Sequence, residues 1–564
     1  MPYTLSRRTF LAQAVAVPAA ARLPTSSAAS AAPQPGDLID AERKAIRSSM
    51  AGSHIGAAAV CLVQEGEPRW VEGFGHVAGA GSAAVDAATM FSIQSTSKNL
   101  AAVAVLLAVQ DGLLDLDVPV TRYLPEFTVR SRFEPSPQER ITLRLLLANR
   151  AGFTHEAPVG NNYEPASPGF AAHVQSISDT WLRFPVGTRY RYSNLGFDLA
   201  GHVLEQATGM RYAEWLRRRL FVPLGMHDST ADPSDYLANA SRALGTQEGF
   251  REVPAETPLV VSGGVWTSAR DMSRYLAFML GRGEGGGQRL LARPLWDEMH
   301  GFGLGGDYGL GVMRSERCYG GTPVRLLHHR GGGFGFGCVF TYCIEADVGF
   351  AAMFNRATAA GYGYGEQLLD ALLSARFGRR QPRCPASALA PIALDRARAR
   401  QLEGGWIGRN VRAEMRGGEG GTLRLRRDPA VAARLFTAVD GDEMFIVDSD
   451  GEAIRYRYHA ATAELPAHLE CALGEESLDQ NDGPGLPAGP QAPHWARWLG
   501  RYRIDQWGAP SQVVELQQRS GWLYIDGIRL VAELEPGLLF TSDGEAVDLR
   551  GSAPTWRNLR LHRL

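Results

Sequence analysis

The residues with the clearest capacity for chemistry are a serine and a lysine in the stretch FSIQSTSKNLAAVAVLLAVQDG, residues 91–112. Ser95 and Lys98 stand three positions apart at the start of an apolar run. On a helix this spacing places both side chains on one face, so the amine can take the proton of the hydroxyl. The pattern predicts an activated serine nucleophile, and the alternative is that Ser95 only caps a helix.

The apolar run after Lys98 predicts the element that holds this pair. Apolar residues lie nearly all round the expected helix, which is typical of a buried central helix rather than a surface one. Upstream, residues 38–50 are expected to form a helix, and residues 54–78 two strands joined by a turn at Gly66-Glu67-Pro68. The nucleophile is therefore predicted to lie at the start of a buried helix that follows a strand pair.

Two further groups of residues come later in the chain. Tyr192-Ser193-Asn194 is expected on a turn just before an amphipathic helix. His329-Arg330-Gly331 opens a glycine-rich segment ahead of two expected strands, 335–344 and 347–354. Glycines at a strand edge let a substrate approach the backbone closely. Taken singly, the first group is also compatible with a plain turn, and His329 with a structural histidine.

In this order, Ser-x-x-Lys, Tyr-x-Asn and His-x-Gly resemble the serine β-lactamase and penicillin-binding protein superfamily. The likeness is closest to the class C β-lactamase-related serine hydrolases, which include D-aminopeptidases, DD-peptidases and esterases, and in which His-x-Gly often replaces Lys-Thr-Gly. Segments at 141–153, 184–194, 223–226 and 262–280 are similar to that family as well. The resemblance covers roughly residues 38–378. It implies an α/β (α+β) domain with an antiparallel sheet flanked by helices.

The resemblance implies a serine hydrolase that works through an acyl-enzyme. Ser95 would attack a carbonyl carbon with Lys98 as general base, and Tyr192 would relay a proton to the leaving group or activate the deacylating water. The backbone N–H groups of Ser95 and Gly332 would hold the oxyanion. Candidate substrates are peptides with D-residues, small esters and β-lactams. The alternative is a penicillin-binding sensor or scaffold that is acylated at Ser95 without efficient turnover.

The remaining site residues are expected to bind the substrate. Asn194 would hold an amide carbonyl, and Gly331 would line the strand edge beside the substrate. His329 stands where related enzymes often have a lysine, which removes a fixed positive charge and weighs against recognition of a β-lactam carboxylate. Neighbouring side chains on a strand alternate between faces, so Arg330 is not expected to replace that charge. Residues 149–152, Asn-Arg-Ala-Gly, depart from the family pattern, and the floor of the site is expected to differ there.

Beyond residue 378 the composition changes, which predicts a Pro/Ala-rich linker at 379–392 and all-β domains after it. Trp-Ile-Gly-Arg at 406 recurs as Trp-Leu-Gly-Arg at 498, and Ser-Asp-Gly-Glu-Ala at 449 recurs at 542. Similar offsets predict two copies of one β unit. With the resemblance, they imply barrel-like domains at 393–478 and 492–564. Each copy is short for a closed eight-stranded barrel, so one sandwich built from both is the alternative.

The resemblance also suggests a role for these domains. In D-aminopeptidase relatives a loop from a C-terminal domain enters the cleft and restricts the substrates. A glycine-rich stretch at 415–425 is the candidate for such a loop in this chain. On this hypothesis, deletion of residues 393–564 would broaden the substrate range.

Composition narrows the classes of partner. Among 564 residues, Lys and Arg total 58 and Asp and Glu total 60, so the net charge gives no reason to expect a nucleic acid or an anionic membrane surface. No HExxH motif or Cys/His cluster indicates a metal, and no cofactor is expected. A Gly-x-Ser-x-Gly elbow is also missing, which argues against an α/β-hydrolase. A small-molecule or peptide substrate is the expected partner.

The first 32 residues resemble a twin-arginine export signal. Arg7 and Arg8 precede a short Ala-rich apolar run that is too short to span a membrane. A periplasmic or extracellular protein is therefore expected, with no membrane segment once the signal is removed. Six cysteines are scattered along the chain, and buried thiols are expected for most of them although pairing is open in an oxidising compartment.

Overall fold

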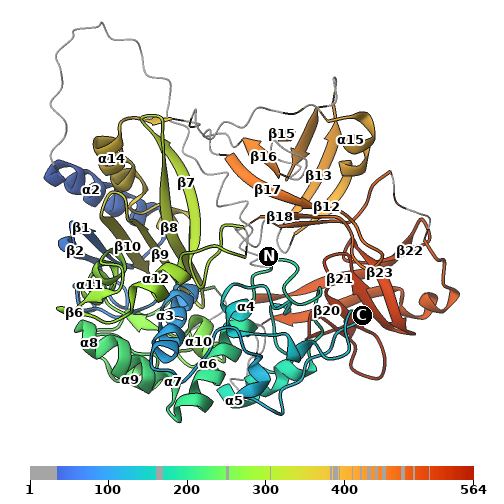
Figure 1. Cartoon of the computed structure of the whole chain (residues 1–564), viewed down its shortest axis with the longest axis horizontal. Helices are drawn as coiled ribbons and strands as arrows, with labels where there is room; N and C mark the ends of the chain where they lie inside the picture. Colours follow the sequence, from blue (N-terminus) through green and yellow to red (C-terminus); the bar gives the residue numbers. More distant parts are fainter. Residues whose placement is uncertain are drawn as a thin grey trace, which may run out of the picture.

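The computed structural model describes residues 35–564, with gaps at 161–168, 249–252 and 305 and several short gaps between 382 and 508. The predicted export signal lies outside the described residues. The chain forms a mixed α/β domain followed by two all-β domains that lie beside it (Figure 1). The predicted fold class is confirmed.

The α/β domain is built on a seven-stranded antiparallel sheet with the order β11-β7-β8-β9-β10-β1-β2. Its strands are β1 (Ala57–Gln64), β2 (Glu67–Gly75), β7 (Met313–Tyr319), β8 (Thr322–Gly333), β9 (Phe336–Cys343), β10 (Val348–Phe354) and β11 (Arg380–Gln381). The chain leaves this sheet after β2 and returns at β7, and β1 pairs with β10. The two strand pairs predicted from the sequence are both present. The glycines at 331–333 belong to the end of β8 and not to a loop ahead of the sheet.

Both faces of the sheet are covered, which explains why β1 is apolar at nearly every position. Ala57, Ala59, Cys61 and Val63 belong to one core cluster, together with α3 (Ser97–Gln110) and α11 (Ala269–Leu280). Ala58, Val60 and Leu62 belong to the other cluster, together with α2 (Pro35–Ser53) and α14 (Glu366–Phe377). This alternation is the two-residue period of a strand that is buried on both sides.

The region between β2 and β7 forms a mainly helical layer that surrounds α3. Its helices are α4 (Leu143–Leu147), α5 (Phe170–Ser176), α6 (Leu195–Thr208), α7 (Tyr212–Leu216), α8 (Val222–Leu224), α9 (Pro233–Ala238), α10 (Val260–Gly263) and α12 (Arg293–Met299), and α13 (Ala359–Tyr362) follows the sheet. Every residue of α3 from Ser97 to Ala108 is buried. Two short ladders, β3 (Phe91–Ser92) with β4 (Trp266–Thr267) and β5 (Glu284–Gly285) with β6 (Gln288–Arg289), complete the layer. The predicted buried central helix is therefore present.

The first all-β domain is a closed barrel, although its sequence is short for one. Its strands are β12 (Gly404–Ile407), β13 (Arg412–Gly417), β14 (Leu423–Arg426), β15 (Arg434–Ala438), β16 (Glu443–Val447), β17 (Ala453–His459), β18 (His468–Glu470) and β19 (Leu478–Gln480). The barrel closes because β19 pairs with β12, and α15 (Arg396–Leu402) precedes it. Strands of only a few residues are long enough to enclose a core around Trp406.

The second all-β domain has a separate nine-stranded sheet. Its strands are β20 (Gly500–Gln506), β21 (Ala509–Arg519), β22 (Trp522–Ile525), β23 (Ile528–Glu535), β24 (Leu538–Thr541), β25 (Ala546–Asp548), β26 (Thr555–Trp556), β27 (Leu559–Arg560) and β28 (His562–Arg563). The sheet is curled, because its two end strands, β27 and β28, follow one another in the chain and only Leu561 separates them. Each repeat thus forms its own sheet, and the alternative of one shared sandwich is wrong. The repeated motif Ser-Asp-Gly-Glu-Ala cannot be compared between the two domains, because residues 449–452 of its first copy lie outside the described residues.

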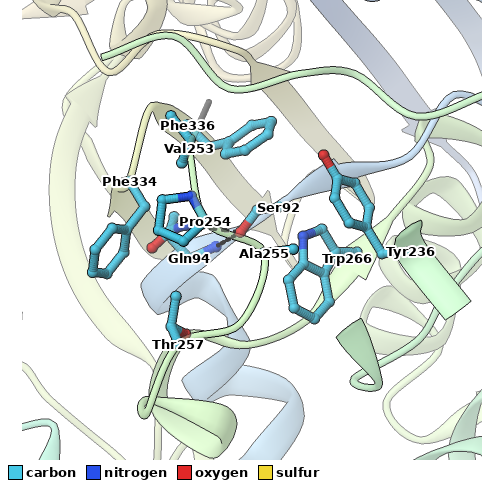
Figure 2. A pocket seen from close by; sticks show the side chains of 11 residues that line it. Ser92, Gln94, Tyr236, Val253, Pro254, Ala255, Thr257, Trp266, Phe334 and Phe336 are labelled. Atoms are coloured by element: carbon cyan, nitrogen blue, oxygen red, sulfur yellow. Dashed lines mark hydrogen bonds between the residues drawn. The ribbon is translucent and has the colours of Figure 1, made fainter. Parts of the chain in front are cut away.

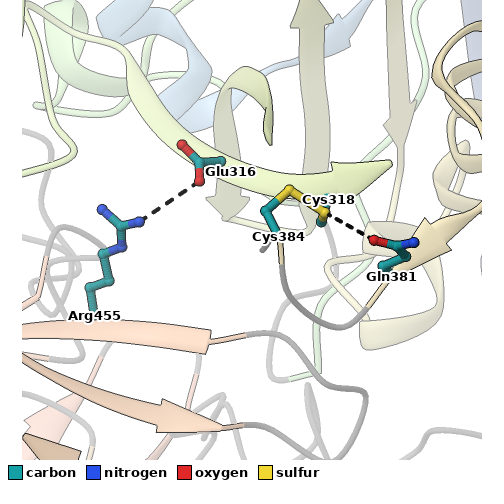
Figure 3. Close-up of a disulfide and its surroundings, with 5 residues drawn as sticks. All are labelled: Glu316, Cys318, Gln381, Cys384 and Arg455. Carbon is teal, nitrogen blue, oxygen red and sulfur yellow. Dashed lines mark hydrogen bonds and ion pairs between the residues drawn. A yellow bond between two sulfur atoms is a disulfide. The ribbon is translucent and has the colours of Figure 1, made fainter. Parts of the chain in front are cut away.

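A disulfide joins the edge of the seven-stranded sheet to the segment after β11. Cys318 on β7 is bonded to Cys384, just beyond β11 (Figure 3). Cys61, Cys338 and Cys343 are buried thiols. Next to the disulfide, Glu316 on β7 lies 3.8 Å from the guanidinium of Arg455 on the barrel. Among the described residues no helix is long and apolar enough to cross a membrane.

Candidate active site

Ser95 and Lys98 lie where the ladder of β3 gives way to helix α3. Ser95 is on a 3-10 turn, Gln94–Thr96, and Lys98 is in the first turn of the helix. The Lys98 amine lies 3.2 Å from the Ser95 hydroxyl. Lys98 is fully buried, whereas Ser95 is half-buried. Just before the serine, Gln94 has a φ of 48°, a left-handed backbone that costs energy for a residue with a Cβ and often marks functional sites.

The surroundings of the Lys98 amine favour a role as a base. The amine also lies 2.7 Å from the Asn194 side-chain oxygen and 2.8 Å from the Ser262 carbonyl oxygen. A neutral amine has two N–H donors and one lone pair. In the structure the amine donates to all three oxygens. Once it has lost one proton, the Asn194 and Ser262 oxygens can accept its two N–H bonds, and its lone pair can face the Ser95 hydroxyl. The arrangement can therefore receive the serine proton.

Asp198 on α6 holds the Ser262 carbonyl in place. One oxygen of its buried carboxylate accepts the backbone N–H groups of Val261 and Ser262, at 3.1 and 2.9 Å. The other accepts the Ser262 hydroxyl at 2.8 Å. Sequence reasoning missed both residues. Asp198 stands four positions after Asn194, so the two side chains lie on one face of the helix. This spacing could have identified Asp198 from the sequence.

The Tyr192 ring lies over the Lys98 amine, with 4.8 Å between the nitrogen and the ring centroid. Its centroid is also 6.3 Å from that of the His329 ring and 6.1 Å from that of His155. Tyr192 and Asn194 both come just before α6, and the Asn194 side chain contacts the same Lys98 amine. The structure thus brings both ends of the Tyr-x-Asn motif to Lys98.

His329 is fully buried on β8 and is neutral. Its Nδ1–H donates to the Arg330 carbonyl at 2.9 Å, and its Nε2 accepts from the Tyr308 hydroxyl at 3.1 Å. Burial is the main cause that lowers the pKa of His329 to about 3, and the nearby Lys98 amine adds to the effect when it is protonated. Arg330 is exposed, as the alternation of a strand predicts. This side of the site therefore carries no positive charge from either residue, and Tyr308 is a neighbour that sequence reasoning missed.

The glycines at the end of β8 let this strand approach the Ser95 turn. A Cβ on Gly331 would stand 1.9 Å from the Ile93 carbonyl oxygen and 3.1 Å from the Gln94 side chain. A Cβ on Gly332 would point the other way, 2.0 Å from the Tyr362 hydroxyl. That hydroxyl donates to the Gly331 carbonyl at 2.8 Å and so holds the strand from behind.

A shallow hollow, partly open to solvent, lies beside the Ser95 turn (Figure 2). Gln94 and Gly263 line the side next to the site, and the Gln94 amide donates to the Ser92 hydroxyl at 2.8 Å. Aromatic rings form much of the remaining wall, namely those of Tyr236, Trp266, Phe334 and Phe336. The surface next to the Ser95 turn is therefore largely aromatic on this side.

In the part of the chain that the structure describes, no group of three His, Cys, Asp or Glu residues is arranged to hold a metal ion. Serine, lysine and tyrosine at these distances can carry out acyl transfer without one.

Parts of this chain are similar to known proteins. The family model described as Beta-lactamase matches residues 43–374. Beta-lactamase-like protein 4 of Dictyostelium discoideum is 28% identical over 34% of this chain and 36% of its own length. The D-alanyl-D-alanine-carboxypeptidase/endopeptidase AmpH of Escherichia coli is 25% identical over 39% of this chain and 57% of its own. The matched region thus spans only about a third to somewhat over half of these relatives.

Solved structures show the same fold over a larger share of the chain. The structure of SurE has a TM-score of 0.56 at 22% identity and covers 79% of this chain and 99% of SurE. The octameric penicillin-binding protein homologue from Pyrococcus abyssi has a TM-score of 0.51 at 20% identity, covering 78% of this chain and 99% of that protein. The family model matches more than half of the chain, and so the chain belongs to the β-lactamase family of serine hydrolases and penicillin-binding proteins.

Proposed function

We propose that this protein is an exported serine hydrolase that cleaves amide or ester bonds through an acyl-enzyme at Ser95. The observation that carries the proposal is the buried Lys98 amine, which has acceptors for two N–H bonds and faces the Ser95 hydroxyl with its third direction. Removing Ser95 should abolish the activity.

In the proposed acylation, the Ser95 oxygen bonds to the substrate carbonyl carbon and its proton moves to the Lys98 amine. The carbonyl oxygen becomes an oxyanion held by the backbone N–H groups of Ser95 and Gly332. One such donor typically contributes about 3 to 4 kcal/mol to the transition state. When the bond to the leaving group breaks, Tyr192 passes it a proton, which Lys98 restores to the phenol.

In the deacylation step, water attacks the ester carbon of the acyl-enzyme. Its proton passes to Lys98 or Tyr192, the carbon to Ser95 oxygen bond breaks, and the serine recovers a proton. Asn194 keeps the amine in place and can also bind a substrate amide. Both half-reactions thus use one group of residues around one amine.

The proposed substrates carry no carboxylate next to the cleaved bond. His329 is neutral at working pH and Arg330 is exposed, so neither is placed to bind a carboxylate inside the site. This favours amides and esters, including peptides with D-residues, over β-lactams. One solved structure of the similar protein SurE contains D-Leu, which supports D-residues as a substrate class.

The test is a substrate panel combined with active-site labelling. We expect kcat/KM to be higher for D-amino-acid amides and p-nitrophenyl esters than for nitrocefin, and a fluorophosphonate to label wild type but not Ser95→Ala, as followed by intact mass. Equal labelling of Ser95→Ala would refute the assigned nucleophile. A fluorescent penicillin adduct that persists, without turnover of any panel member, would instead indicate the sensor.

Export is part of the proposal and has its own test. The Cys318–Cys384 disulfide is typical of proteins that fold in an oxidising compartment. In cells that make the full chain, we expect the processed protein in the periplasmic or extracellular fraction. A replacement of Arg7 and Arg8 by lysine should retain it in the cytoplasm, and unchanged fractionation would contradict the twin-arginine route.

A further inference from the structure

The segment just before the Tyr192 turn has two chemically different faces. Tyr190 and Tyr192 turn inward, and both rings contact Tyr308, with centroids 5.4 and 6.4 Å away. Arg189 and Arg191 alternate with them and turn outward to the first barrel. The period of two along an extended chain explains this separation. One face therefore belongs to the site and the other to the domain interface.

The barrel holds the outward face through Asp479 on β19. Both Arg189 and Arg191 form buried ion pairs with this carboxylate. Arg189 also donates to the Pro466 carbonyl at 3.0 Å, and Arg191 to the Ser477 carbonyl at 3.1 Å. Two arginines that flank Tyr190 are thus tied to one barrel residue.

Glu470 on β18 reaches the same segment directly. One of its oxygens accepts the Tyr190 backbone N–H at 3.3 Å, and the other accepts the Arg150 guanidinium at 2.7 Å. Burial works to raise its pKa, but hydrogen bonds and charges from His459 and Arg150 hold that pKa down to about 2. The carboxylate therefore stays charged across the working pH range.

Residues 149 and 150 connect these barrel contacts to the Tyr192 turn. The Asn149 carbonyl accepts the Arg191 N–H at 2.9 Å, and the Asn149 side-chain oxygen accepts the Ser193 N–H at 3.0 Å. The residues on both sides of Tyr192 are therefore fixed by Asn149. Its neighbour Arg150 is the one that Glu470 holds. Asn149 and Arg150 belong to the stretch 149–152, whose sequence departs from the family pattern.

The second all-β domain holds the other side of the same turn. The Ser193 hydroxyl donates to the Thr154 carbonyl at 2.6 Å, and the Thr154 hydroxyl donates to Glu545 at 2.6 Å. Glu545 also lies 3.2 Å from the Arg183 guanidinium. Both C-terminal domains thus make contacts that lead to the residues on either side of Tyr192.

We infer that Glu470, Asp479 and Glu545 are positioning residues that keep the Tyr192 turn in its working geometry. The two β domains are then part of the catalytic machinery and not only a filter on substrates. None of the three acids needs to touch the substrate, because each acts through Arg150, Arg189, Arg191 or Thr154. The inference rests on the proposed function, since it assigns these acids to the proton transfer made by Tyr192.

The test separates the chemistry of Ser95 from that of Tyr192 by the choice of leaving group. Fluoride leaves a fluorophosphonate without a proton, so labelling needs Ser95 and Lys98 but no acid. An amine needs a proton to leave, and p-nitrophenolate needs one much less. A displaced Tyr192 should therefore slow amides most, p-nitrophenyl esters less and labelling least.

We expect full-length Glu470→Gln, Asp479→Asn and Glu545→Gln each to lower kcat for an amide by about tenfold to a hundredfold, the size of effect that a small misplacement causes. KM should change little, and fluorophosphonate labelling should keep the wild-type rate. Asp479→Glu, which preserves the charge, should recover part of the loss. Tyr192→Phe, which lacks the phenol hydroxyl, is the reference variant: it should slow amides most, p-nitrophenyl esters less and labelling least.

Glu316→Gln is the matched control, because Glu316 pairs with Arg455 across the same interface but stands on β7, away from Tyr192. It should behave as wild type. The inference is overturned if the three variants lose labelling and hydrolysis in equal proportion, which indicates misfolding, or if they match Glu316→Gln. A wild-type protein without Ser95-dependent labelling would refute the proposed function itself, and the inference with it.

Discussion

The Lys98 amine lies closer to the Asn194 side-chain oxygen than to the Ser95 hydroxyl, at 2.7 Å against 3.2 Å. Asn194 is held at the start of α6, in the buried core. An amide oxygen accepts a hydrogen bond from either form of the amine without carrying a charge of its own. It can therefore orient Lys98 without fixing the amine in its protonated form.

Replacement of Asn194 by aspartate should shift the pH profile of the enzyme. A carboxylate beside the amine stabilises the ammonium, so the form of Lys98 able to act as base is populated only at higher pH. We expect the acidic limb of kcat/KM for a p-nitrophenyl ester to move upward in Asn194→Asp. Asn99→Asp is the control, since Asn99 is a buried neighbour on α3 that bonds Gly311 and Tyr275 instead. It should lower stability but leave the limb in place.

Two adjacent glycines should respond differently to alanine. In Gly331→Ala the new Cβ would meet the Ile93 carbonyl at 1.9 Å, a backbone group that cannot move away, so β8 must separate from the Ser95 turn. We expect kcat/KM to fall by about a hundredfold or more, as for other displaced reactive groups. In Gly332→Ala the obstacle is the Tyr362 hydroxyl at 2.0 Å.

Removing that hydroxyl should therefore relieve the second variant only. We expect Gly332→Ala/Tyr362→Phe to be more active than Gly332→Ala, whereas Gly331→Ala/Tyr362→Phe should be no better than Gly331→Ala. The measurement is kcat/KM for one ester across the five proteins, Tyr362→Phe included. Rescue of both glycine variants would contradict the two opposite directions described for their Cβ atoms.

The part of the site that the sequence could predict is the part carried by local spacing. Ser95 and Lys98 share a helix face, and Tyr192 and Asn194 share a turn, so each pair could be found within a few residues. Ser262 and Tyr308 come from separate segments. Ser262 begins the family-like segment 262–280, but nothing in the sequence pairs it with Lys98, and Tyr308 belongs to no motif. They reach Lys98 and His329 only through the packing of α10 and of the turn before β7.

The β domains illustrate the same limit on a larger scale. Their repeat predicted two β units, and the structure has two sheets of similar kind. The alternation of Arg189 and Arg191 with tyrosines indicates a segment with two faces, but it does not say what lies opposite. Because Asp479 and Asp543 lie opposite the buried arginines, we expect deletion of residues 393–564 to lose activity rather than broaden the substrate range.

His329 should make the fold less stable in acid. The unfolded chain binds a proton at this histidine below about pH 6.5, whereas the folded protein excludes it until about pH 3. The free energy of unfolding is therefore fully retained above pH 6.5 and falls below it, by up to about 1.4 kcal/mol per pH unit for this group. Urea denaturation at pH 5 and pH 7 should show a smaller difference for His329→Gln than for wild type. The exposed His227→Gln should keep the wild-type difference.

The Cys318–Cys384 bond should stabilise the fold without taking part in the chemistry. It spans 66 residues and crosses from β7 to the segment after β11, at the sheet edge next to β8. Closing a loop of that length contributes about 4 kcal/mol in the chain-entropy account. We expect Cys318→Ser/Cys384→Ser to unfold at lower urea concentration than wild type, yet to keep its kcat at 25 °C because Ser95 and Lys98 are held by the core around α3. Reductant should lower the urea midpoint of wild type and leave the double variant unchanged. If reductant inactivated wild type well below its unfolding midpoint, the bond would have a role in the site.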